Sequence, residues 1–193
     1  MKKILIATRN KDKFKIVSNL LKSVFKNYTF KSLDDIEDII NDKAENGDLI
    51  NRSYRKAKNA FDEIKYNDYE YIIGVDDGIE INGKIIENVK DYIKPIIDNK
   101  ILKENEVVYI IRSYTFINKE GIKYSILTKI PFKYKRINYK LEIKKGTYPL
   151  SHVLTPLDLD TVVADMDSNE TNKYYTLYSK IKFIETKNYF NNN

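Results

Sequence analysis

The chain has 193 residues and no cysteine, which excludes a disulfide scaffold and a thiolate metal site. Its 34 Lys and Arg against 28 Asp and Glu give a formal net charge of +6, which suits a polyanionic partner such as nucleotide phosphate, nucleic acid or an anionic membrane. No apolar run approaches the roughly 18 residues that cross a bilayer. We therefore expect one cytoplasmic domain spanning residues 1–193 that does not enter a membrane.

The first third of the chain has the pattern of a strand, a helix and a second strand. Ile4–Ala7 is a short apolar run rich in β-branched side chains, and apolar residues recur at helical spacing from Phe14 to Phe25. Asn10 is a suitable N-cap for that helix, because its side chain can accept hydrogen bonds from the first free amides. With a strand at Tyr28–Ser32, these segments predict a βαβ unit with parallel strands.

A second helix and a buried strand are predicted in the middle of the chain. Apolar residues at spacings of three and four between Asp48 and Ile64 indicate an amphipathic helix with Lys and Arg on its outer face. Residues 71–75 read as a buried strand that ends at the turn sequence Asp76-Asp77-Gly78. Beyond it, the dipeptide Asn-Gly at 82–83 lies between alternating apolar residues and predicts a β-hairpin.

The second half reads mainly as strands followed by one helix. Strands are predicted at 107–118 and 122–130, with a less regular strand at 139–143. A final helix is predicted from about residue 168 to residue 184. No linker or fixed repeat divides the chain.

The segment Thr8-Arg9-Asn10-Lys11-Asp12-Lys13 lies where the first strand gives way to the first helix. A helix N-terminus offers free amides and a positive dipole, to which Thr8, Asn10 and Lys13 add side-chain donors. Arg9 adds a guanidinium fork for phosphate if its side chain turns inward. The pattern predicts a phosphate cradle, with an ordinary solvated helical turn in a Lys-rich chain as the alternative.

Asp76 and Asp77 are predicted at the end of a hydrophobic strand, where open α/β sheets collect ligand residues. Adjacent carboxylates there can hold Mg²⁺, which keeps water and substrate phosphates in its shell, or can accept a proton from an attacking water. Glu45, in the loop before the second helix, can complete a metal site with Asp76. The alternatives are turn chemistry for the pair and a solvating role for Glu45.

His152 is the only histidine of the chain. A single His without Cys argues against a Ser-His-Asp triad and against a structural zinc site. We expect it to be a structural group or to lie at the edge of a substrate site. The 16 Tyr and 8 Phe can stack on bases, but core packing in strands explains them equally well.

Taken in order, these segments resemble the house-cleaning nucleoside triphosphate pyrophosphatases that act on inosine and xanthosine triphosphates. Thr8-x-Asn10-x-x-Lys13 matches the family's Thr-x-Asn-x-x-Lys phosphate loop. Glu45 with Gly47 is similar to its acidic loop. The run Arg-Lys-Ala-Lys-Asn-Ala at 55–60 resembles its Asn-Arg-Ala-x-Asn-Ala helix, and Gly-Val-Asp-Asp-Gly-Ile at 74–79 aligns with its Ala-Asp-Asp-Ser-Gly-Leu motif.

The chain also departs from that pattern. Asp76 falls on the carboxylate that the family uses for catalysis and metal binding, while Val75 replaces a second acid and Asp77, which can stand in for it, replaces a small residue. The family's Gly-Phe-Gly-Tyr-Asp-Pro stretch is absent, and Tyr-Thr-Leu at 175–177 stands where the family has Ser-His-Arg. Lys173 lies in a segment that still resembles the one before the family's last helix.

The resemblance implies an α/β fold with an elongated mixed sheet flanked by helices and two lobes around a central cleft. It also implies a homodimer that hydrolyses a nucleoside triphosphate to the monophosphate and pyrophosphate with Mg²⁺. In this interpretation the phosphate loop faces the Asp pair across the cleft, and oriented cations stabilise the developing charge. The implied catalytic residues are Asp76, Asp77 and Lys13, the metal ligands Glu45 and Asp76, and the substrate contacts Thr8, Arg9, Asn10, Lys13, Lys56 and Lys173.

Two other hypotheses stay open at the level of sequence. A nucleotide-binding protein of the same fold with reduced catalysis is suggested by Val75 and by the missing carboxy-terminal motifs. A basic nucleic-acid-binding protein is suggested by the charge and the Tyr-rich strands, although we do not expect nucleic acid as the partner. That third hypothesis requires affinity for oligonucleotides that falls steeply with salt.

Overall fold

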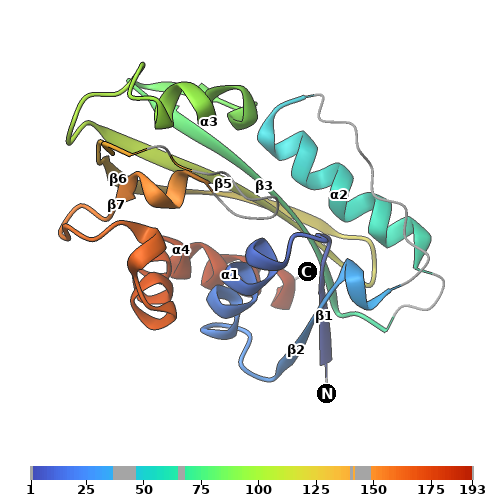
Figure 1. Cartoon of the computed structure of the whole chain (residues 1–193). Coiled ribbons are helices and arrows are strands. Elements are labelled where there is room, and N and C mark those ends of the chain that lie inside the picture. Colours follow the sequence, from blue (N-terminus) through green and yellow to red (C-terminus); the bar gives the residue numbers. More distant parts are fainter. Residues whose placement is uncertain (1, 37–46, 65–67, 140, 142–148, 193) are drawn as a thin grey trace.

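The computed structural model of the chain describes residues 2–36, 47–64, 68–139, 141 and 149–192 (Figure 1). In this described part, a mixed seven-stranded sheet has the strand order β2-β1-β3-β5-β6-β7, and β4 pairs with β3 outside that path. The strands are β1 (Lys2–Ile6), β2 (Tyr28–Ser32), β3 (Tyr71–Ile81), β4 (Lys84–Ile86), β5 (Val107–Asn118), β6 (Lys123–Tyr134) and β7 (Leu154–Thr155). The α-helices are α1 (Lys11–Lys22), α2 (Leu49–Glu63), α3 (Val89–Ile97) and α4 (Ser168–Asn191), with short 3-10 helices η1 (Leu33–Asp35), η2 (Pro149–His152) and η3 (Val163–Asp165).

The two faces of the sheet are covered by different helices. Helices α1 and α4 pack together on one face, and α2 covers the other (Figure 1). The main core lies under α1 and α4 and is lined by alternate residues of β3 and β5, such as Val75 and Tyr114. A smaller apolar cluster under α2 includes Leu5, Ala60 and Ile72. The predicted α/β fold with an elongated mixed sheet flanked by helices is confirmed.

The predicted βαβ unit is confirmed at the start of the chain. β1 pairs in parallel with β2 and also with β3, and α1 connects the first two strands. The Asn10 side chain accepts a hydrogen bond from the backbone N–H of Lys13 at 2.9 Å, as expected of an N-cap. β1 ends at Ile6, whereas β3 continues to Ile81, so the second half of β3 extends beyond β1.

The predicted turn at Asp76-Asp77-Gly78 is wrong, because β3 runs through it without a break. β5 pairs with β3 from Tyr71 to Ile81, so each residue of the predicted turn has a partner in the ladder. The hairpin between β3 and β4 is confirmed. Its turn residues Asn82 and Gly83 have φ angles of 50° and 76°, the left-handed backbone that a two-residue hairpin requires.

The remaining elements differ from prediction mainly at their ends. β5 matches the predicted bounds, while β6 passes through Pro131, a residue that usually interrupts a strand. α4 begins at Ser168 as predicted but continues to Asn191. α3 was not predicted, because Pro95 lies inside it and argues against a helix. Tyr139 is not in a strand, and most of the segment predicted at 139–143 lies outside the described residues.

Helix α2 approaches β3 closely at Gly74, where a side chain would not fit. A Cβ on Gly74 would lie 1.9 Å from the carbonyl oxygen of Ser53 and 2.6 Å from the backbone nitrogen of Ala57. The Ser53 side chain also contacts β5, because its hydroxyl hydrogen-bonds with the hydroxyl groups of Ser113 at 2.8 Å and Thr115 at 2.9 Å. Gly74 therefore fixes how near α2 lies to the strand that carries the two aspartates.

Replacing Gly74 with alanine should lower the free energy of unfolding by about 3 kcal/mol, because the new methyl group meets helix backbone that cannot rotate away. Urea denaturation measures the change. Gly78→Ala is the matched control, since its Cβ would first meet Cδ1 of Leu49, the end of a flexible side chain, at 2.9 Å. A smaller loss for Gly74→Ala than for Gly78→Ala would contradict this account of the contact.

Candidate functional site

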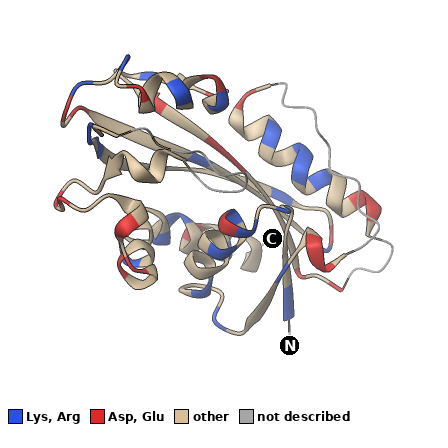
Figure 2. Ribbon diagram, in the orientation of Figure 1, with Lys and Arg blue, Asp and Glu red and all other residues tan. Residues whose placement is uncertain are grey.

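Asp76 and Asp77 lie on β3 at the point where β1 no longer covers its edge. Because successive side chains of a strand point to opposite faces, the two carboxylates lie on opposite sides of the sheet. Asp76 faces α2, and Asp77 faces α1 and α4. Figure 2 shows basic residues on α2 across from the acidic segment of β3. The aspartates therefore form two ion-pair clusters on one strand.

On the α2 face, two cations hold the carboxylate of Asp76. Lys56 Nζ lies 2.5 Å from Asp76 Oδ1, and Arg52 Nε lies 2.6 Å from Asp76 Oδ2. Arg52 is 5% exposed, and its Nη2 donates a hydrogen bond to the carbonyl of Glu87 at 2.7 Å. Each oxygen of this nearly buried carboxylate thus has a basic partner, of which Lys56 is the more accessible.

On the opposite face, Asp77 pairs with Arg112 and Lys13. Arg112 lies directly across the β3–β5 ladder and binds Oδ1 of Asp77 through Nε, while Lys13 Nζ lies 2.8 Å from Oδ2. Burial alone would raise the pKa of Asp77, but Arg112 and Lys13 outweigh it and hold that pKa well below its ordinary value. Asp77 is consequently an anion that fixes Lys13.

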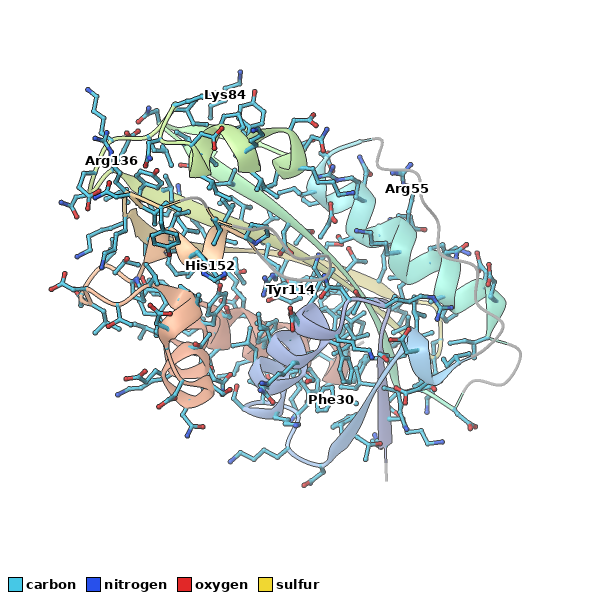
Figure 3. The ribbon with its side chains drawn as sticks, viewed as in Figure 1. Phe30, Arg55, Lys84, Tyr114, Arg136 and His152 are labelled. Atoms are coloured by element: carbon cyan, nitrogen blue, oxygen red, sulfur yellow. The ribbon has the colours of Figure 1, made fainter. Side chains whose placement is uncertain are left out.

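Aromatic side chains enclose Arg112 under α4. The guanidinium carbon of Arg112 lies 5.7 Å from the ring centre of Tyr175, a cation–π distance. Burial raises the pKa of Tyr175 to about 12, so its hydroxyl stays protonated. Tyr114 lies between the sheet and the α1–α4 layer (Figure 3), where its ring contacts Phe183 edge-on with centres 5.0 Å apart.

The loop between β1 and α1 leads into the N-terminus of α1, with Asn10 as the N-cap. The Thr8 hydroxyl accepts a hydrogen bond from the backbone N–H of Asn10 at 3.2 Å. Arg9 donates to the carbonyl of Leu33 at 2.9 Å and pairs with Asp34 at 3.4 Å, so its contacts include η1. Of the predicted Asp pair, Lys13 meets Asp77, whereas Asp76 lies on the opposite face of the sheet with Lys56 and Arg52.

A pocket of about 380 Å³ lies beside this cluster, between α1, η2, η3 and the start of α4. Tyr175 forms part of its wall and also lies beside Arg112. His152 also lines it, on η2 (Figure 3). Asn172 contributes a buried Oδ1 that has no hydrogen-bond partner within the described part of the chain. Lys173, the next residue, is on the exposed side of α4.

Of the predicted metal ligands, Asp76 lies on β3, and Glu45 lies outside the described residues. Within the described ranges, no three His, Asp or Glu side chains are grouped as they would be in a protein-only metal site. Mg²⁺, however, is commonly bound by one or two carboxylates together with substrate phosphates. Asp76 fits that mode, because the Lys56 ammonium group can leave the Asp76 carboxylate and bind a phosphate oxygen instead. The same residues do not form a metal site by themselves.

Arg52 and Arg112 were missed in the sequence. The prediction that Lys and Arg occupy the outer face of α2 is wrong for Arg52, which points inward because Asp76 neutralises it there. Arg52 lies four residues before Lys56, so the two side chains lie on one face of α2. That spacing was the signal in the sequence that could have grouped Arg52 with Lys56. Arg112 is a charged residue in the middle of an apolar strand, a pattern that indicates a buried ion pair.

No protein-family model matches the sequence, and no curated protein matches it. Solved structures do match the fold. The Staphylococcus aureus Ham1 protein superposes with a TM-score of 0.66 at 12% identity, covering 97% of this chain and 99% of that chain. A HAM1 protein from Coxiella burnetii gives 0.63 at 11% identity, covering 97% and 100%. A nucleoside-triphosphatase described as a dITP/XTP pyrophosphatase from Mycobacterium abscessus gives 0.59 at 14% identity, covering 94% and 97%.

The chain has the Ham1 fold. The match spans nearly the full length of each neighbour, so the resemblance seen in the short motifs extends to the whole architecture. The identities are low, which agrees with a divergent sequence on this fold. Among the described residues, no helix is long and apolar enough to span a membrane.

Proposed function

We propose that this protein is a nucleoside triphosphate pyrophosphatase that hydrolyses non-canonical purine nucleotides, such as inosine or xanthosine triphosphate, to the monophosphate and pyrophosphate. The observation that carries the proposal is the meeting of Lys13 with Asp77 and of Lys56 with Asp76 along the part of β3 that β1 leaves uncovered. The Mycobacterium abscessus protein of the same fold is described as a dITP/XTP pyrophosphatase, which supports the same substrate class. We also expect a cytoplasmic enzyme and a homodimer.

The charge of the cluster suits a triphosphate. Each of the two carboxylates is paired with two basic side chains, so each ion-pair cluster has an excess of positive charge that attracts an anion. Lys13 and Lys56 are the more exposed cations and would move from carboxylate to phosphate when substrate binds, with Thr8, Arg9 and Asn10 in the same loop as further contacts. Arg52 and Arg112 are buried and would keep Asp76 and Asp77 in place.

Asp76 is the proposed general base. Once Lys56 transfers to a phosphate, one oxygen of Asp76 becomes available to accept a proton from the attacking water. Mg²⁺, held by Asp76 with Glu45 and the substrate phosphates, would supply additional charge neutralisation at the bond that breaks. Asp77 would contribute by holding Lys13 in place on the other face of β3, which fixes the start of α1 beside the strand that carries Asp76.

The pocket beside Tyr175 would receive the base. It combines apolar surface from Ile16 and Met166 with polar groups at Asn172 and His152, a mixture that suits a flat heterocycle with hydrogen-bonding edges. His152 would then be the substrate-edge group that the sequence allowed. Lys173, which follows Asn172 on α4, would contact the bound nucleotide.

The proposal is tested by incubating the protein with Mg²⁺ and a panel of canonical and non-canonical nucleoside triphosphates, with pyrophosphate release as the readout. Inosine and xanthosine triphosphates should give the highest rates, and Lys13→Met should raise KM because a phosphate contact is lost. Lys22→Met, at the other end of α1, is the matched control and should leave KM unchanged. Release of orthophosphate alone, or no release from any nucleotide, would contradict the proposal.

A nucleotide-binding protein with reduced catalysis is the second candidate, because both oxygens of Asp76 are already engaged by cations. In that case no carboxylate becomes free for a proton, and the basic cluster serves only to bind the anion. Isothermal titration calorimetry separates the two. Nucleotide affinity without pyrophosphate release during long incubation favours the binding protein. Release of pyrophosphate from any of the nucleotides favours the enzyme.

A further inference from the structure

A row of four side chains connects the pocket beside α4 to the start of α1. Tyr175 lines that pocket, and its ring centre lies 5.7 Å from the guanidinium carbon of Arg112. Arg112 binds Asp77 through Nε, and Lys13 Nζ lies 2.8 Å from the other oxygen of the same carboxylate. The row begins on α4 and ends on α1, the two helices that pack together on this face of the sheet (Figure 1). We call these four residues the Tyr175–Lys13 row.

The inner half of the row is closed to solvent. Tyr175 is 3% exposed and Arg112 is 4% exposed, so water does not screen the contact between the ring and the guanidinium. Nη1 of Arg112 is also buried and has no hydrogen-bond partner in the described part of the chain. The guanidinium is held by the Asp77 carboxylate and by the Tyr175 ring. The position of that ring therefore bears directly on the position of the guanidinium.

Asp77 is shared between a cation that stays and a cation that can leave. Burial alone would raise the pKa of Asp77, and Arg112 and Lys13 together offset it and keep the carboxylate ionised. Lys13 is the partner that can leave, because its side chain is 20% exposed whereas that of Arg112 is 4% exposed. Arg112 must then neutralise Asp77 by itself, which a guanidinium fork can do by binding both carboxylate oxygens. Release of Lys13 thus requires a guanidinium held firmly against Asp77.

We propose that Tyr175 and Arg112 are positioning residues that couple the filling of the pocket to the release of Lys13 from Asp77. This inference rests on the proposed function, in which the pocket receives the purine and Lys13 binds phosphate. A purine packed against Tyr175 holds the ring beside Arg112. Arg112 then neutralises Asp77 alone, and Lys13 turns to the phosphates. Without the purine contact, the pair of Lys13 with Asp77 is the favoured arrangement.

This coupling makes the site selective for a whole nucleotide over its separate parts. The row has two arrangements, with Lys13 either on Asp77 or on phosphate, and both the purine and the phosphates favour the second. Coupled sites strengthen each other by the same factor, so the purine improves phosphate binding as much as phosphate improves purine binding. An inorganic polyphosphate has no purine and meets a lysine that Asp77 still holds.

Isothermal titration calorimetry with the two parts of a nucleotide tests the proposal. The Kd of inorganic pyrophosphate is measured for the wild type alone and again in the presence of saturating inosine, a nucleoside that carries no phosphate. Inosine should lower the Kd of pyrophosphate at least about fivefold, the lower end of the usual coupling between two sites. We call this ratio of Kd values the coupling factor.

Variants of Tyr175 show whether the coupling passes through Arg112. Tyr175→Phe keeps an aromatic face for the guanidinium and should keep the wild-type coupling factor, whereas Tyr175→Leu keeps only an apolar wall and should reduce the factor to about one. Tyr178→Leu is the matched control, because Tyr178 is also an aromatic residue of α4 but packs against Tyr174, with ring centres 5.2 Å apart. It should leave the factor unchanged. Circular dichroism checks that each variant is folded.

The outcomes separate the coupling from the proposed function. Pyrophosphate release from inosine triphosphate tests the reaction, and a protein that catalyses it can still show no coupling factor above one. No binding of inosine, a Kd of pyrophosphate that inosine leaves unchanged, or a wild-type factor in Tyr175→Leu would each overturn the coupling. So would a loss of the factor in Tyr175→Phe or in Tyr178→Leu. A factor that only Tyr175→Leu abolishes supports the coupling even in a protein that releases no pyrophosphate.

Discussion

Asp76→Asn should lower kcat for pyrophosphate release by at least about 100-fold, the usual contribution of a positioned general base. The amide keeps the shape of the carboxylate but cannot accept the proton of the attacking water. Asp76 is 9% exposed and receives Lys56 and Arg52 on its two oxygens, so the substitution changes a defined, well-packed position. Steady-state kinetics with the best nucleotide of the panel measures the effect.

Two measurements make this result specific to chemistry. Asp62→Asn is the control, because Asp62 also pairs with a lysine of α2, Lys58, but is exposed on the outer side, and its rate should not change. Circular dichroism must show that Asp76→Asn is folded, since it leaves Arg52 without its counter-charge. An Asp76→Asn enzyme that works at the wild-type rate would remove Asp76 from the mechanism and leave only a structural role for it.

The segments that build the site could be predicted from the sequence. The arrangement of Asp76 and Asp77 within the site could not. The N-cap at Asn10 and the hairpin turn at Asn82-Gly83 depend on local backbone chemistry, and both are as predicted. The turn at Asp76-Asp77-Gly78 was inferred by the same local chemistry and is wrong, because the long-range ladder with β5 overrides the turn preference of Asp and Gly. Rules based on neighbouring residues cannot identify that partner strand.

The same limit explains why the partners of the aspartates were missed. Whether Arg112 is buried depends on Asp77 lying opposite it in the β3–β5 register, and 35 residues separate the two in the chain. Arg52 in turn reaches Asp76 only because Gly74 lets α2 approach β3. The phosphate loop could be predicted because its residues are contiguous. The basic side chains that neutralise Asp76 and Asp77 come from three separate elements, α1, α2 and β5.

Asp77→Asn should be strongly destabilising, with a loss of about 3–5 kcal/mol in the free energy of unfolding at neutral pH. The reason is the guanidinium of Arg112, which is 4% exposed and would be left in the core without a counter-charge. Urea denaturation measures the loss. Glu70→Gln is the matched control, because the Lys2–Glu70 pair also joins distant segments but is solvent-exposed at Lys2, and it should cost less than about 1 kcal/mol.

Removing both charges should cost less than removing one. The double variant Asp77→Leu/Arg112→Met replaces the pair with apolar side chains under Tyr175, and well-packed replacements of buried ion pairs are often close to neutral. It should therefore be more stable than Asp77→Asn. If Asp77→Asn alone is as stable as the wild type, the Asp77–Arg112 pair does not hold β3 to β5 in the way that the geometry indicates.

The pH dependence gives an independent check on Asp77. Its pKa in the folded protein lies below the unfolded value, so its stabilising effect is fully present above the unfolded pKa of about 3.9 and is lost as the pH falls toward the folded pKa. The difference in unfolding free energy between wild type and Asp77→Asn should thus be constant near neutral pH and shrink below about pH 4. A difference that grows on acidification would mean that Asp77 is not held as an anion by Arg112 and Lys13.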